Sequence, residues 1–144
     1  MKLLDANILL HAYDSSSTHH AVCRDWLQVA LNGDEPVGLP WQTSLAFIRI
    51  ATNPRAVRRP LATADACAIV SALLERPGVA VVEPGEQFWG NFQQVITEAR
   101  VSGPLVTDAV LVALALEQGA SLCSTDRDFR RFRGVTVVDP TDAG

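Results

Sequence analysis

Short apolar runs alternate with longer helical patterns along the whole chain, and this alternation restricts the fold more than any other feature of the sequence. Strands that are separated by helices pair in parallel and are covered by helices on both faces. We therefore predict an α/β fold, a three-layer α/β/α sandwich with a mainly parallel sheet, formed by residues 1–144 as one domain. The predicted strands are residues 2–4, 37–39, 79–82, 120–123 and 135–138; the predicted helices are residues 7–13, 19–31, 41–52, 63–75, 86–100 and 105–118, with a short helical segment at 128–132.

Three of the predicted helices carry more detailed signals. Thr63 is of a residue type that commonly caps the start of a helix, and Gly119 is typical of the residue that follows the last turn. In the helix at 19–31, apolar residues at helical spacing predict the buried side. We expect that side to consist of Val22, Trp26, Val29 and Ala30.

Composition restricts the class of protein further. Hydrophobic residues make up 48% of the chain and charged residues 19%, as in globular rather than disordered proteins. Asp5 interrupts the first apolar stretch, and no run approaches the roughly 18 apolar residues of a membrane-spanning helix, so we predict no membrane association. The cysteines at 23, 67 and 123 are odd in number and lack metal-binding spacing, which indicates reduced thiols and a cytoplasmic location.

Four aspartates follow or interrupt apolar segments: Asp5, Asp108, Asp126 and Asp128. Asp5 ends the first predicted strand and Asp126 follows the fourth, and sites in open α/β sheets lie beyond the carboxyl ends of the strands where strand order reverses. The two acids converge there if their strands are neighbours. Asp108, in the first turn of an apolar helix, is directed to the same end of the sheet. No lysine or histidine in these segments is placed to pair with the acids, and carboxylates favour Mg²⁺ or Mn²⁺, so we predict a metal site.

Each of these acids also has a structural alternative. Asp5 precedes a helix and is a favourable N-cap. Asp126 is placed to cap the next helical segment, and Thr125 with Asp128 matches a capping box. Asp108 is the hardest to explain without a cation, because a lone carboxylate in a buried helix costs several kcal/mol or becomes protonated. Taken together, the four acids favour the metal site.

Basic residues are unevenly distributed, although the formal net charge of the chain is −4. Of the twelve lysines and arginines, eight are arginines in two short clusters: Arg49, Arg55, Arg58 and Arg59, then Arg127, Arg130, Arg131 and Arg133. The planar guanidinium group suits phosphate, so these clusters indicate contact with nucleic acid. The alternative is a solvated arginine face.

The order and spacing of four motifs resemble the PIN-domain proteins, specifically the toxin ribonucleases of the VapC type from bacterial toxin–antitoxin pairs. The motifs lie at residues 4–7, 39–55, 103–109 and 124–129, and the resemblance covers essentially the whole chain. It implies a PIN-like sandwich fold and a site that binds Mg²⁺ or Mn²⁺ and cleaves RNA. It also implies a homodimer and a VapB-like antitoxin as partner.

The resemblance assigns roles to individual positions. Asp5, Asp108 and Asp126 match the metal ligands, with Asp128 as an additional catalytic acid. Two polar residues, Asn7 and Ser124, match positions that support the ligands. Arg127, which lies between two of the acids, and Arg49 are predicted to contact RNA.

One departure from the family pattern concerns the helix at 41–52. Most members carry a glutamate in this helix, whereas here the helix contains no acid. By register the position falls near Ala46, with Ser44 as the other candidate. The site is thus one ligand short, and we expect one firmly held metal and a second that is weak or recruited with the RNA phosphate.

The four acids predict a metal site, and the resemblance implies a metal-dependent endoribonuclease that acts as the toxin of a type II toxin–antitoxin pair on RNA of the tRNA or rRNA class. The competing prediction is a catalytically degenerate PIN-fold module that binds RNA or antitoxin without cleaving. A third possibility is a metal-dependent DNA nuclease.

Overall fold

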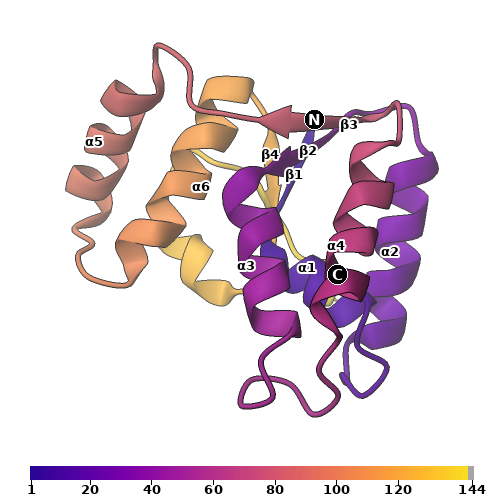
Figure 1. Ribbon diagram of the computed structural model, residues 1–144. Coiled ribbons are helices and arrows are strands. Elements are labelled where there is room, and N and C mark those ends of the chain that lie inside the picture. Colours follow the sequence, from indigo (N-terminus) through magenta and orange to yellow (C-terminus); the bar gives the residue numbers. More distant parts are fainter. Residues whose placement is uncertain (143–144) are drawn as a thin grey trace.

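The computed structural model describes residues 1–142 and confirms the predicted α/β sandwich (Figure 1). The predicted elements are present, with ends that differ by at most two residues. The strands are β1 (Lys2–Leu4), β2 (Val37–Pro40), β3 (Val79–Val82), β4 (Ser121–Cys123) and β5 (Val137–Val138); the helices are α1 (Ala6–Ala12), α2 (His20–Asn32), α3 (Trp41–Ala51), α4 (Thr63–Leu74), α5 (Phe88–Ala99), α6 (Leu105–Gln118) and the 3-10 helix η1 (Arg127–Arg131). Ala143 and Gly144, which the predicted domain includes, lie outside the described residues.

Within residues 1–142 the five strands form one parallel sheet in the order β3-β2-β1-β4-β5. Starting from β1, the chain adds β2 and then β3 on one side of the sheet. It then returns to β1 and adds β4 and β5 on the other side. The strand order therefore reverses between β1 and β4. This confirms that the strands preceding Asp5 and Asp126 are neighbours, and it locates the crevice where ligands of such sheets bind.

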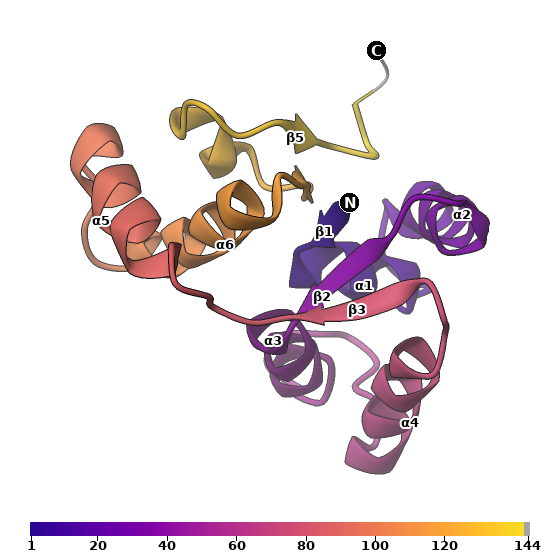
Figure 2. The same cartoon turned by 90° about the horizontal axis from the view of Figure 1, so that it is seen from above.

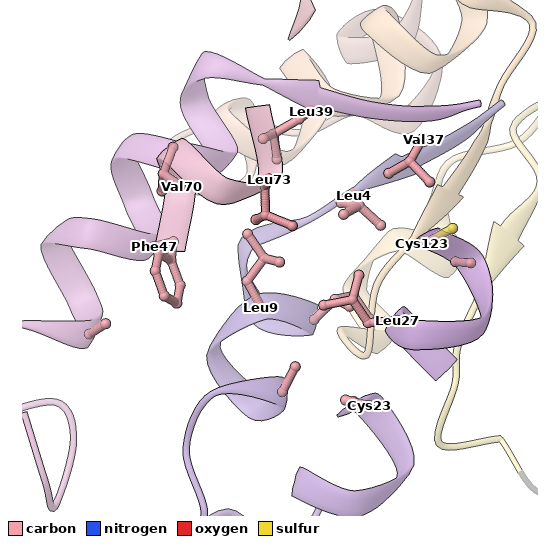
Figure 3. Packing of buried hydrophobic residues seen from close by; sticks show 14 of the residues in the cluster. Leu4, Leu9, Cys23, Leu27, Val37, Leu39, Phe47, Val70, Leu73 and Cys123 are labelled. Atoms are coloured by element: carbon pink, nitrogen blue, oxygen red, sulfur yellow. The ribbon is translucent and has the colours of Figure 1, made fainter. Parts of the chain in front are cut away.

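In β1 and β4, neighbouring residues contribute to two separate cores. Leu3 and Leu122 pack with apolar residues of α5, α6 and η1. Leu4 and Cys123, one position further along, pack with residues of α1, α2, α3 and α4 on the other face. This period of two is the alternation expected of a sheet covered on both sides. Figure 2 shows the two groups of helices on opposite sides of the sheet, and Figure 3 shows the core beneath α1 to α4.

Helix ends follow the sequence prediction at one position and depart from it at another. Gly119 follows α6 with a φ of +62°, the left-handed conformation for which glycine is favoured, as predicted. The prediction for Thr63 was wrong: the N-cap of α4 is Ala62, without a side-chain capping bond, and Thr63 is the first helical residue. Asp65 in the first turn supplies the negative charge that favours a helix start.

The predicted buried side of α2 was also partly wrong. The buried residues are Cys23, Leu27 and Ala30, whereas Val29 is 74% exposed. Cys23, Leu27 and Ala30 are spaced by four and three positions, so they form an equally regular apolar stripe with smaller side chains. Small side chains permit close packing against α1, and Trp26 then lies partly buried at the border of the contact.

Two findings concern the predictions made from composition. No helix among the described residues combines the length and the apolar character needed to cross a bilayer. All three cysteines are free thiols, with Cys67 exposed and the other two buried.

Candidate active site

Asp5 stands at the point where the strand order reverses. It follows β1 directly and is the N-cap of α1, because its Oδ1 accepts a hydrogen bond from the N–H of Ala6 at 2.7 Å. Its own backbone N–H donates to the carbonyl oxygen of Cys123 at 3.0 Å, which extends the contact between β1 and β4. The capping role considered for Asp5 is therefore real, and it fixes the carboxylate at the sheet edge.

A buried hydroxyl group joins the two strand ends. The Oγ of Ser124, which is fully buried, donates to Oδ2 of Asp5 at 2.8 Å and accepts from the N–H of Asp126 at 3.0 Å. It also accepts from Nδ2 of Asn7 at 3.0 Å, and the same amide donates to Oδ2 of Asp5 at 3.1 Å. The Oδ1 of Asn7 accepts from the N–H of Thr125 at 3.1 Å. Ser124 and Asn7 thus hold the Asp5 and Asp126 segments in one network.

The tightest group of acids is formed by Asp108, Asp126 and Asp128. One carboxylate oxygen from each lies within 4.8 Å of the others. Asp126 caps η1 by accepting from the N–H of Asp128 at 2.9 Å, which confirms Asp126 rather than Thr125 as the capping residue. This group differs from the predicted ligand set, since Asp128 is included and Asp5 is not. Asp5 stays apart because Ala6, Asn7 and Ser124 hold its carboxylate.

The acids repel one another electrostatically. The pKa of Asp108 is raised to about 6, first by burial and then by the negative charges of Asp126, Asp5 and Asp128, while the charge of Arg131 acts in the opposite direction. Such a raised pKa is typical of functional sites in which like charges are held together.

The pKa of Asp5 is raised as well, and burial is the largest cause. The hydrogen bonds from Ser124 and from the N–H of Ala6 lower it, because they stabilise the ionised form, and the charge of Asp126 raises it again. The two acids on opposite sides of the crevice therefore share one electrostatic environment.

A cavity of about 80 Å³ lies between Asp5 and Asp108. Helix α3 lines it with Gln42 and Ala46, and α6 adds Thr107. Gln42 and Ala46 are four residues apart and so share one face of α3. Ala46 therefore occupies the place where a glutamate on this helix would face the two aspartates.

The neighbouring residues of α3 serve structural roles. The buried Thr43 donates its Oγ1 to the carbonyl oxygen of Leu4 at 2.7 Å, which attaches α3 to the end of β1. Ser44, the other candidate for the missing acid, is 1% exposed, and its hydroxyl has no hydrogen-bond partner among the described residues. Ser44 is not among the residues that line the cavity, so Ala46 is the position at which the ligand is lacking.

Comparisons with known proteins agree with this geometry. A family model described as PIN domain matches residues 2–135. Ribonuclease VapC37 from Mycobacterium tuberculosis (strain ATCC 25618 / H37Rv) is 40% identical over 140 residues, which are 97% of this chain and 97% of that protein. Ribonuclease VapC43 from the same strain is 38% identical over 142 residues, 99% of this chain and 97% of that protein. The chain belongs to the VapC family of PIN-domain ribonucleases.

The fold of this VapC chain also matches solved structures. The structure of VapBC-1 from nontypeable Haemophilus influenzae gives a TM-score of 0.68 at 19% identity, and the match covers 97% of this chain and 98% of that chain. The PIN-like sandwich predicted from the motifs is thereby confirmed.

The acidic group of this VapC chain fits a divalent cation. Carboxylate oxygens are the ligands that Mg²⁺ and Mn²⁺ prefer. In the described part of the chain, Asp108, Asp126 and Asp128 form no ion pair with lysine, arginine or histidine. Three carboxylates without a cationic partner, held close enough to raise a pKa, are a donor set whose charge a metal ion would balance.

Of the two arginines predicted to contact RNA, Arg127 adjoins the acids of the VapC site. Arg127 is exposed and is the first residue of η1, between Asp126 and Asp128. Arg49 is exposed in the last turn of α3, seven residues after Gln42, and so shares the face that carries Gln42. The other arginines of the first cluster, Arg55, Arg58 and Arg59, are exposed in the segment between α3 and α4.

Sequence reasoning missed three residues of this site. Gln42 and Thr107 line the cavity, and Thr43 attaches α3 to the strand end. Arg131, predicted only as part of an arginine cluster, also acts electrostatically on Asp108. The position of Thr107 beside Asp108 and the helical spacing of Gln42 and Ala46 were the available signals.

Proposed function

We propose that this chain is a metal-dependent endoribonuclease that hydrolyses RNA phosphodiester bonds as the toxin of a toxin–antitoxin pair. The observation that carries the proposal is the group of Asp108, Asp126 and Asp128, whose oxygens lie within 4.8 Å of one another at the point where the strand order reverses. The relatives that match nearly the whole chain are named ribonucleases. We propose Mg²⁺ or Mn²⁺ as the metal, held by Asp5, Asp108 and Asp126 with help from Asp128.

Different residues of the chain contribute to hydrolysis in different ways. Phosphodiester hydrolysis needs an activated water and stabilisation of charge on the phosphoryl oxygens, and a bound divalent metal supplies both. The network of Ser124 and Asn7 keeps Asp5 and the Asp126 segment at fixed positions. We propose that Arg127, between Asp126 and Asp128, binds a phosphate of the substrate, which gives affinity without sequence choice.

Ala46 supports a second candidate function. Because the site lacks a carboxylate at this position, a PIN-fold module that grips RNA or an antitoxin without cleaving is the alternative. The two functions differ in one observable, which is turnover that depends on metal.

We further propose a VapB-like antitoxin and a second copy of the chain as protein partners. The antitoxin is supported by the structure of VapBC-1, a protein of similar fold whose name combines VapB with VapC. Large apolar side chains support additional interfaces, since Trp89 and Leu45 are each 62% exposed and Trp41 is 43% exposed. Exposed apolar residues of this size commonly mark protein contact surfaces.

Substrate, location and domain extent complete the proposal. We propose RNA of the tRNA or rRNA class as substrate, and the free thiols are in keeping with a reducing compartment such as the cytoplasm. Residues 1–144 are proposed as one PIN-like domain, supported by a family match that spans residues 2–135.

The deciding experiment is cleavage of a pool of total tRNA and rRNA by the purified, antitoxin-free chain in the presence of Mn²⁺, Mg²⁺ or EDTA. We expect discrete fragments with metal, none with EDTA, and a loss of at least about 100-fold in rate for Asp108→Asn. Asp65→Asn is the matched control, because Asp65 is an exposed acid in the first turn of α4.

The outcomes separate the candidate functions. Fragments that require metal and Asp108 but not Asp65 support the nuclease. Intact RNA with a folded chain that still binds RNA favours the non-cleaving module. Cleavage of single-stranded DNA at a rate matching that of RNA contradicts the assignment to RNA.

A further inference from the structure

The proposed nuclease site leaves unexplained a second cavity, whose volume is about 520 Å³. It lies between the C-terminal end of α5 and the segment that follows η1, and its lining includes Arg100, Arg131 and Arg133. Apolar residues, among them the buried Phe132, form the rest of its wall together with Glu98. This volume lies within the range of roughly 300–1,000 Å³ that is typical of ligand sites.

The cavity carries an excess of positive charge. Three guanidinium groups face one carboxylate, that of Glu98, which accepts a hydrogen bond from Nε2 of Gln94 at 2.9 Å. Within residues 1–142, none of Arg100, Arg131 and Arg133 forms an ion pair. By contrast, Arg130 is paired with Asp142 at 3.3 Å and does not line the cavity. The unpaired cations leave the cavity suited to an anion with several oxygens, such as a phosphate group.

Arg100 occupies a conformation that arginine disfavours. It is the residue after α5, with φ +55° and ψ 44°, and it is the only non-glycine residue with positive φ in the described part of the chain. Gly119 ends α6 in nearly the same conformation, at φ +62° and ψ 31°. Side chains other than glycine are strained there by roughly 1–2 kcal/mol. An arginine at this position costs stability, and its side chain lines the cavity, which points to a role in binding.

The cavity and the acidic group share one structural support. Arg131 is the last residue of η1, the helix that begins after Asp126, and its charge acts on Asp108. Phe129 and Phe132 are buried in the core beneath α5 and α6, so they fix this segment against the sheet. Figure 1 shows η1 beside the N-terminal end of α6. An RNA strand bound at the acids therefore has a basic cavity next to it.

We propose that the cavity lined by Arg100, Arg131 and Arg133 binds a backbone phosphate of the RNA beyond the scissile bond. The inference rests on the proposed nuclease function, because the strand reaches the cavity from the acidic site. Two or three guanidinium groups around one phosphate hold the strand in place, and the apolar wall contacts the adjoining sugar. This subsite increases affinity for RNA irrespective of its sequence.

The test measures binding of a fluorescein-labelled single-stranded RNA of about 12 nucleotides. All proteins carry Asp108→Asn so that the RNA stays intact, and fluorescence anisotropy is followed between about 50 and 200 mM KCl. We expect Arg100→Gly and Arg133→Ala each to weaken binding about fivefold and to reduce the salt slope by about 0.7. Arg24→Ala is the matched control and leaves both quantities unchanged, because Arg24 is an exposed arginine of α2, which packs on the other face of the sheet.

Thermal unfolding separates a binding role from a structural one. Arg100→Gly relieves the left-handed strain, so its Tm is unchanged or higher than that of the parent while its RNA affinity is lower. RNA binding equal to that of the parent in both Arg100→Gly and Arg133→Ala overturns the subsite. A labelled polyglutamate peptide tests the competing ligand: if these variants lose the peptide but keep the RNA, the cavity binds an acidic protein segment and the proposal is wrong.

Failure of the subsite and failure of the nuclease give different results. Metal-dependent cleavage by the unsubstituted chain, combined with RNA binding that ignores Arg100 and Arg133, overturns the subsite alone. Absence of cleavage combined with arginine-dependent RNA binding overturns the nuclease and supports the cavity as a phosphate site.

Discussion

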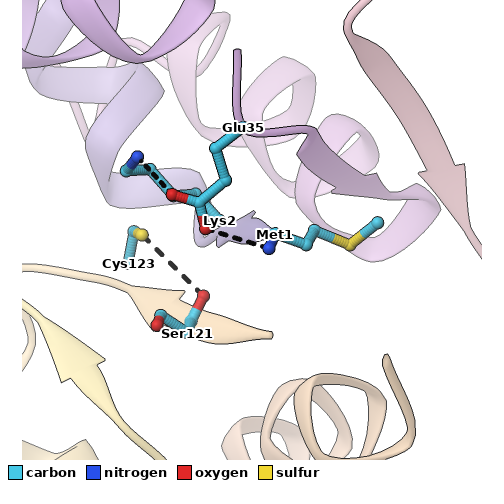
Figure 4. Close-up of polar contacts among 5 residues, drawn as sticks. All are labelled: Met1, Lys2, Glu35, Ser121 and Cys123. Carbon is cyan, nitrogen blue, oxygen red and sulfur yellow. Dashed lines mark hydrogen bonds and ion pairs between the residues drawn. The ribbon is translucent and has the colours of Figure 1, made fainter. Parts of the chain in front are cut away.

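The parallel sheet has an amino edge, where its strands begin, and a carboxyl edge, where they end. Charged residues are arranged in opposite ways at these two edges. At the amino edge, the carboxylate of Glu35 forms two ion pairs (Figure 4). Its Oε2 lies 2.9 Å from the N-terminal ammonium group of Met1, and its Oε1 lies 2.7 Å from Nζ of Lys2. These two hydrogen bonds lower the pKa of Glu35 to about 2. At the carboxyl edge, burial and like charges raise the pKa of Asp108 to about 6. One edge pairs its charges internally, whereas the other gathers charges of one sign.

This difference distinguishes a charge cluster with a structural role from a charge cluster that binds a ligand. At the amino edge two cations surround one carboxylate, so the cluster is complete without a ligand. At the carboxyl edge three carboxylates meet without a cationic partner in the described residues, so the cluster is completed only from outside. The predictions below test whether this imbalance is what makes the carboxyl edge functional.

The largest effect expected is stabilisation by metal at the carboxyl edge. At a Mn²⁺ concentration 100 times the Kd, binding to the folded state adds about 2.7 kcal/mol to the free energy of unfolding. Scanning calorimetry measures this as a rise in Tm. Asp126→Asn is expected to lose most of the rise, whereas Glu35→Gln at the amino edge keeps it. A rise of equal size in Asp126→Asn would place the metal elsewhere.

A smaller effect is expected when the missing carboxylate is restored. Ala46→Glu adds an acid that faces the cavity between Asp5 and Asp108. We expect Mn²⁺ affinity to increase by about tenfold, since affinity for hard cations rises with the number of charged ligands. The metal-free variant is less stable, because a further negative charge joins the group. Titration calorimetry checks the affinity, and Ala46→Gln is the neutral control of similar size.

The third prediction uses the pH dependence of stability without metal. The pKa of Asp108 in the folded state is about 6, above its ordinary value of 3.8, so the folded chain binds this proton more tightly than the unfolded chain. The contribution of Asp108 is therefore favourable near pH 4 and is lost as the pH rises through 6. Asp108→Asn should be more stable than the unsubstituted chain at about pH 7.5, by about 1 kcal/mol after allowance for solvent screening.

Urea unfolding in EDTA at several pH values provides the measurement. The advantage of Asp108→Asn should shrink toward pH 4, where both side chains are neutral. An advantage that stays constant with pH would mean that packing rather than charge repulsion is the cause.

The smallest effect is expected at the amino edge. Glu35→Gln removes an exposed charge from two ion pairs, and exposed pairs contribute little to stability. We expect Tm to fall by about 2 °C or less, and the difference to fade at high salt. A fall in Tm for Glu35→Gln that exceeds the metal-induced rise lost in Asp126→Asn would reverse the contrast between the two edges.

Much of this arrangement was predictable because it follows from topology. The convergence of Asp5 and Asp126 requires only that their strands be parallel neighbours and that strand order reverse between them. The contacts of Asn7 and Ser124 follow from their places beside those acids. These relations are set by the fold, which the alternation of strands and helices already indicates.

Other features depend on local geometry that the sequence pattern does not contain. The inclusion of Asp128 and the separation of Asp5 follow from the capping bond that starts η1 and from the hydrogen bonds that hold Asp5. The left-handed conformation of Arg100 could not be predicted either, because glycine is the residue expected there. The buried face of α2 was mispredicted because the helix carries two apolar stripes with the spacing of a buried face.

The hydrogen bonds of Asp5 set a limit on its ligand chemistry. A carboxylate has about four lone-pair positions, two on each oxygen. Oδ2 accepts from Asn7 and Ser124, and Oδ1 accepts from the N–H of Ala6, so one position on Oδ1 remains among the described contacts. Asp5 is thereby restricted to binding a cation or a water through a single oxygen, whereas no hydrogen bond to another described residue occupies the side chain of Asp108.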